Sequence, residues 1–104
     1  MLKPIRTTIK TIDLGSKTAT ITVTHYTGKV RRRDPVTFKN LGWKQVNRVG
    51  AKCDLYPNGE WYPYVDFGEK TVSGSFDGWE LREPEFPVVE NAVKDLLFEA
   101  AGWK

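Results

Sequence analysis

Residues 17–26 read KTATITVTHY, and this stretch decides the fold class. Small apolar side chains alternate strictly with threonines, so one face of the stretch carries Ala19, Ile21, Val23 and His25. A period of two with this many β-branched residues is typical of an antiparallel strand with one buried face. The stretch therefore predicts a sheet built from hairpins, with its apolar side turned toward a core.

Turn signals on either side divide the chain into such hairpins. Gly15-Ser16 joins residues 17–26 to an earlier alternating run, whose apolar parity shifts between Ile9 and Ile12 and so predicts a bulge there. Thr27-Gly28 and Asn58-Gly59 are the next expected turns. Further strands are expected over residues 29–33, 51–55, 60–67 and 71–76, with another at 79–82. On their parity, Cys53, Trp61 and Phe67 belong to the core.

Two helices are expected. Asp34-Pro35 followed by Gly42 predicts a short helix over residues 35–41. The last part of the chain has apolar residues at helical spacing, namely Phe86, Val89, Val93, Leu96, Leu97 and Ala100. The apolar stripe of this helix must be buried, and the apolar faces of the hairpins are the available surface. The sequence thus predicts an α+β fold, an antiparallel sheet of five or six strands with a C-terminal amphipathic helix packed on one face.

Length and composition indicate one domain, residues 1–104. Cys53 is the only cysteine, so no disulfide can form within the chain. No signal peptide is recognisable at the N-terminus, and no apolar run reaches the roughly 20 residues of a membrane span. A cytoplasmic protein with a buried, unreactive thiol is the expectation.

Charge is distributed very unevenly along the chain. Residues 1–52 hold twelve of the sixteen Lys and Arg residues against two acids, whereas residues 53–104 hold eleven acids against four bases. The halves carry formal charges of +10 and −7, which the net charge of +3 conceals. Such asymmetry indicates a polyanionic partner or a charged interface.

The run KVRRR at residues 29–33 is the strongest candidate site. Guanidinium groups bind phosphate oxygens through two hydrogen bonds, and cations interleaved with aromatic rings are typical of single-stranded nucleic-acid binding. We therefore expect a basic surface that engages nucleic acid, or the nucleic-acid channel of a larger complex. Solvation of an edge strand is the competing explanation. The expected phosphate contacts are Lys29, Arg31, Arg32, Arg33, Lys44 and Arg48, and the expected stacking or anchoring residues are Tyr26 and Trp43.

A protein-interaction or inhibitor module is the alternative. Tyr62 and Tyr64 lie on the polar parity of their strand, and exposed tyrosines beside an acidic half suit binding to a basic partner surface. The oppositely charged halves also allow one copy to join the next in a homo-oligomer.

No catalytic constellation is recognisable. One histidine and one cysteine do not make the usual zinc site, the carboxylates lack calcium-loop spacing, and the glycines do not form a phosphate loop. We expect no enzyme activity, no bound metal and no other cofactor. In its size and in its exposed charged and aromatic surface, the chain resembles accessory or inhibitor proteins carried by phages and mobile elements.

Overall fold

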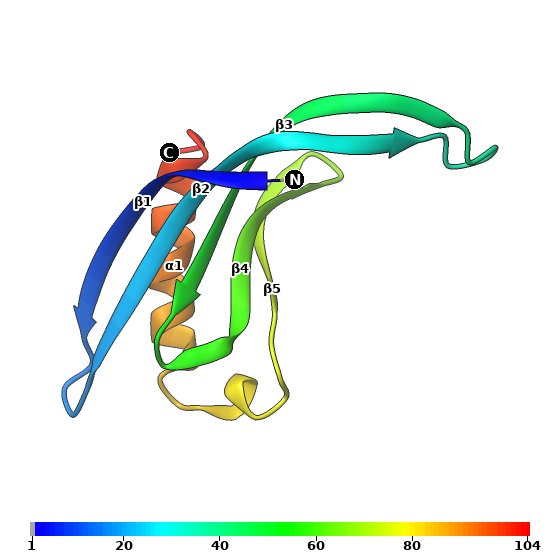
Figure 1. Cartoon of the computed structure of the whole chain (residues 1–104). Helices are drawn as coiled ribbons and strands as arrows, with labels where there is room; N and C mark the ends of the chain where they lie inside the picture. The colour runs from blue at the N-terminus through cyan, green and yellow to red at the C-terminus, as the bar shows by residue number, and fades with distance from the viewer. Residues whose placement is uncertain (1) are drawn as a thin grey trace.

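The computed structural model describes residues 2–104, which form one antiparallel sheet with its five strands in sequence order and a helix on one face (Figure 1). The predicted α+β class and C-terminal helix are confirmed. The elements are β1 (Leu2–Asp13), β2 (Thr18–Arg33), β3 (Asn40–Cys53), β4 (Tyr56–Asp66), β5 (Glu69–Ser75), a short 3-10 helix η1 (Glu80–Arg82) and α1 (Phe86–Ala100).

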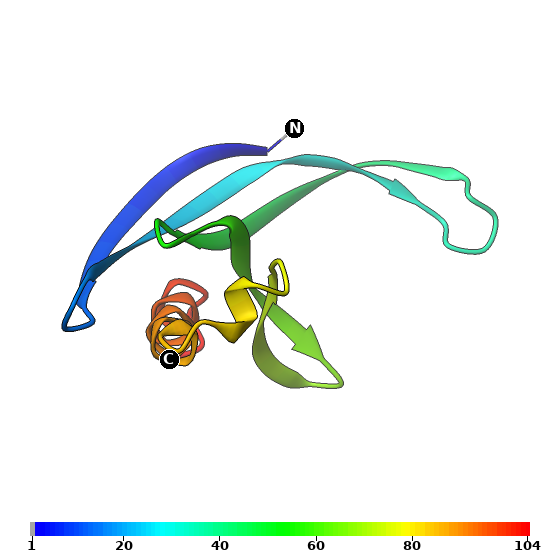
Figure 2. The same ribbon diagram turned by 90° about the horizontal axis from the view of Figure 1, so that it is seen from below.

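The alternation in β2 buries one of its faces under α1. Ala19, Ile21 and Val23 are at most 2% exposed, and they share the core with the helix residues Val89, Val93 and Leu97. Figure 2 looks nearly along α1 and shows the helix lying against one side of the sheet. The opposite face of β2 carries threonines, as the alternation predicts.

An aromatic cluster completes the core beside α1. The ring of Trp61 lies 4.4 Å from that of Phe76 and 5.8 Å from that of Phe86, measured between centroids. Gly59 and Gly74 flank the Phe76 ring, because a Cβ built on either glycine would overlap it. The predicted turn at Asn58-Gly59 is therefore wrong: β4 runs through both residues, and glycine is present to admit the ring.

The predicted turn at Thr27-Gly28 and the predicted helix over residues 35–41 are also wrong. β2 continues through Gly28, which lies opposite Val46 in β3. Residues 34–39 form only the turn between these strands, and β3 has already begun at Asn40. The Asp34 side chain caps the N–H groups of Val36 and Thr37 as at a helix start, but the pairing of β2 with β3 stops the helix from propagating.

Three smaller expectations need correction. The bulge in β1 lies between Pro4 and Arg6, so Ile9 is 64% exposed on the face away from α1. Phe67 is 99% exposed rather than buried, because Phe67 and Gly68 are the two central residues of a tight hairpin turn and both have positive φ. The strand expected at residues 79–82 is the 3-10 helix η1.

We predict that the Cys53 thiol reacts slowly in the folded protein. Cys53 is 2% exposed, and burial raises the pKa of its thiol, so both access and the thiolate fraction are reduced. Labelling with a maleimide should be far slower in native buffer than in guanidinium chloride. Equal rates in the two solvents would show that β3 does not hold this side chain against the core.

Candidate nucleic-acid interface

Beyond the pair Thr27–Asn47, β2 and β3 leave the core together as a two-stranded hairpin. We call residues 28–46 the arm. Figure 1 shows it projecting from the upper end of the sheet, and the molecule measures 52 Å along its longest axis and 28 and 25 Å along the others. Among the described residues, the core and the side chains packed against it include none from the arm. The arm is thus held by strand pairing and by a side-chain hydrogen bond from Gln45 to Thr27 rather than by the core, and most of its residues are exposed.

Positive charge is concentrated on the arm. It contains six basic residues and one acid, Asp34. The Asp34 carboxylate accepts hydrogen bonds from the backbone N–H groups of Thr37, at 3.1 Å, and Val36, at 2.8 Å. These bonds lower the pKa of Asp34 and fix the turn. The Asp34 carboxylate therefore stays ionised and shapes the end of the arm, and the arm keeps a net formal charge of +5.

The register of the arm distributes its arginines over both faces. Arg31 lies opposite Trp43, whereas Arg32, on the other face, lies opposite Gly42. The Arg31 guanidinium carbon is 5.3 Å from the centroid of the Trp43 ring, and Trp43 is 61% exposed. A cation stacked on an open ring offers a phosphate and a base adjacent binding surfaces. The remaining candidate cations, Lys29, Arg33 and Lys44, follow the same two strands.

The root of the arm opens onto a cleft. β3 pairs with β4 only through Ala51–Trp61 and Cys53–Tyr56, and nearer the arm the two strands diverge. The space between them has a volume of about 1000 Å³ and extends to the end of α1. Tyr26 in β2 and Arg48 in β3 are cross-strand neighbours, and both line this cleft.

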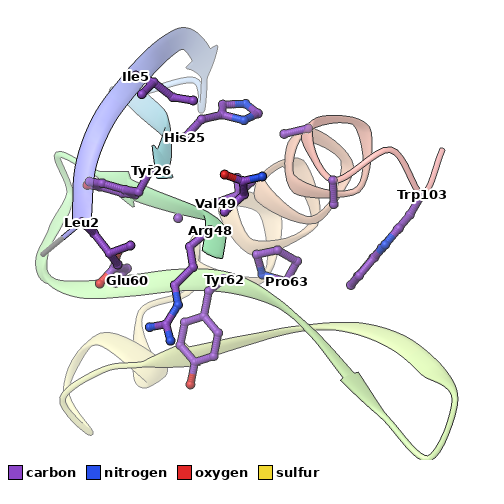
Figure 3. Close-up of a pocket in the computed structure, with 14 residues that line it drawn as sticks. Leu2, Ile5, His25, Tyr26, Arg48, Val49, Glu60, Tyr62, Pro63 and Trp103 are labelled. Atoms are coloured by element: carbon purple, nitrogen blue, oxygen red, sulfur yellow. The ribbon is translucent and has the colours of Figure 1, made fainter. Parts of the chain in front are cut away.

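Tyr62, proposed for protein binding, lines the same cleft from β4, and Figure 3 shows Arg48 pointing toward it. Trp103 enters from the far side, beyond the end of α1. Tyr64 lies two residues beyond Tyr62 on the same face of β4 and is 47% exposed. Tyr26, Arg48 and Tyr62 therefore line one cleft, while the other basic candidates lie along the arm.

Sequence reasoning missed the apolar residues at the end of the arm. Val36, Phe38 and Leu41 are 82%, 74% and 54% exposed, and they alternate with Arg33, Lys39 and other polar residues. Phe38 has a φ of 60°, in the left-handed region that a bulky residue rarely adopts. The sequence signal that could have identified this apolar surface is an apolar residue inside a turn, flanked by charged residues.

Within residues 2–104, no three His, Cys, Asp or Glu side chains are grouped closely enough to hold a metal ion. Over the same residues no helix is long and apolar enough to cross a membrane. No family model matches the chain, and neither a curated protein nor a solved structure matches it significantly. The arm and the cleft at its root are therefore interpreted from their own geometry.

Proposed function

We propose that this protein is a non-enzymatic module that binds single-stranded nucleic acid along its arm. The observation that carries the proposal is the arm itself, a solvent-exposed ribbon with six basic residues, one internally bonded acid and the exposed Trp43 ring. Phosphates would follow the cations and bases would stack on the ring. Arg48 and Tyr26 extend this surface to the root of the arm.

To test nucleic-acid binding by the arm, its three arginines are replaced together. Replacing Arg31, Arg32 and Arg33 by serine should weaken binding to a fluorescent oligonucleotide and reduce the log–log salt slope by about 0.7 per lost contact, or roughly two in total. Thermal stability should change little, because exposed charges contribute little to it. Fluorescence anisotropy across a salt titration measures both the affinity and the slope.

A matched control removes the same charge elsewhere. Serine at Lys10, Lys52 and Lys94, all outside the arm, should leave the salt slope close to that of the parent. If the parent binds no oligonucleotide between about 50 and 100 mM salt, where phosphate contacts are readily detected, direct binding is excluded. Equal loss in both triple variants would mean that net charge, and not the arm, attracts the nucleic acid.

A protein-binding module is the second candidate, and the exposure of Tyr62 and Tyr64 favours it. These rings are 42% and 47% exposed on one face of β4. Aromatic anchors respond less to salt than phosphate contacts do. A partner that is retained from a nuclease-treated extract at high salt, and lost when both tyrosines become serine, would favour this function over the first.

A further inference from the structure

The chain exposes more surface than a folded monomer of its size normally does. Its accessible surface is 7420 Å², whereas the usual scaling gives about 5,900 Å². Its radius of gyration is 15.8 Å, against about 13 Å for a compact domain of this length. The surplus of roughly 1,500 Å² exceeds the ~800 Å² that one partner contributes to a standard interface. Surplus of this size is typical of chains that bury surface on assembly.

The end of the arm has the properties of a docking element. We call residues 33–42 the tip. Its exposed apolar side chains are Val36, Phe38 and Leu41, and its turn is held by hydrogen bonds to Asp34. Because the turn is already ordered, docking would cost little conformational entropy.

A surface of complementary character lies beside the start of α1. We call residues 77–88 the foot. Trp79, Leu81 and Val88 are 76%, 56% and 54% exposed there, among four acids and one base. The acids are Asp77, Glu80, Glu83 and Glu85, and the base is Arg82. The foot thus has a net formal charge of −3, with Glu85 paired to Lys17, whereas the tip, which holds Arg33, Lys39 and Asp34, has a net formal charge of +1.

The two surfaces cannot meet within one molecule. Figure 1 shows the arm leaving the upper end of the sheet and directed away from the foot, which lies at the lower end. Contacts of tip with tip, or of foot with foot, would bring like charges together and are disfavoured. Only the tip of one copy and the foot of another combine apolar burial with opposite charge.

We propose that the tip of one molecule docks on the foot of a second copy, so that copies join head to tail. A contact between two different patches of this kind is heterologous and repeats until it closes a ring or forms a filament. The cations nearer the root of the arm stay exposed in this arrangement. If the proposed function is correct, copies joined in this way would bind a strand cooperatively.

The test measures mass by sedimentation velocity over a range of protein concentrations without nucleic acid, so its outcome does not depend on the proposed function. The parent should associate as its concentration rises, and less so at about 1 M salt, where the screening length falls to about 3 Å. Phe38→Ser in the tip and Trp79→Ser in the foot should each return the protein to monomer. Phe67→Ser is the matched control, since Phe67 is an exposed phenylalanine at another hairpin turn with positive φ, and it should associate like the parent.

Mixing the two monomeric variants is the decisive step. The Phe38→Ser chain keeps an intact foot and the Trp79→Ser chain keeps an intact tip, so the mixture should form dimers that grow no further. A parent that stays monomeric at every concentration, or a mixture that stays monomeric, overturns the proposal. Equal dissociation by Phe67→Ser does so too. Circular dichroism checks each fold, and Leu81→Ser replaces Trp79→Ser if the latter unfolds.

Discussion

Replacing Val93 by aspartate is expected to unfold the protein. Val93 is fully buried between α1 and the sheet, where the new carboxylate would find neither water nor a partner. Burying such a group costs several kcal/mol, a large part of the roughly 5–15 kcal/mol that stabilises a domain. Urea denaturation followed by circular dichroism should show little or no folded baseline.

Asn91→Asp provides the control on the same helix, outside the foot. Asn91 is exposed on α1, so its aspartate would remain in water while adding the same negative charge to the helix. This variant should denature near the parent. If Val93→Asp also denatured near the parent, α1 would not be packed on the sheet through this face.

A Gly59→Val substitution is expected to disrupt the aromatic cluster. The new side chain would overlap the Phe76 ring, and the ring has Gly74 on its other flank and Trp61 beside it. Overpacking a core usually costs about 1–3 kcal/mol, and a displaced ring that also loses its burial should place the loss near the upper end. The measurement is the free energy of unfolding in urea.

Two further variants isolate the cause. Gly78→Val should be tolerated, because no heavy atom outside Gly78 and its two chain neighbours lies within 4 Å of a Cβ built there. In a Phe76→Ala background Gly59→Val should cost much less than in the parent, because the overlap has been removed. An undiminished cost in that background would mean that β4 needs glycine for its backbone and not for the ring.

The elements with periodic apolar residues were predictable from the sequence, whereas the positions of the turns between elements were not. β2 and α1 follow from apolar spacing, since burial of one face dictates each pattern. Gly28 and Gly59 were interpreted as turns because a sequence does not show that a paired strand, or a ring such as that of Phe76, occupies the position. Asp34-Pro35 starts a helix and a tight turn equally well, and only the partner strand decides between them.

The basic residues of the candidate site were predictable from the sequence, but the cleft at the root of the arm was not. The arginine run identified which residues are basic, and the register of the strands places Arg31 and Arg32 on opposite faces. The divergence of β3 from β4 has no local signal, because it results from pairing between residues far apart in the sequence. The cleft that joins Arg48 to Tyr62 therefore became visible only in the structure.

The separation of the arm from the core has a consequence for how the chain can vary. Since residues 28–46 supply nothing to the core among the described residues, selection on folding hardly constrains their identity or number. Removing two residues from each strand would keep every remaining side chain on its face and shorten the reach by about 7 Å, whereas removing one would exchange the faces. This one hairpin can therefore be trimmed, extended or replaced while the core of the molecule stays unchanged.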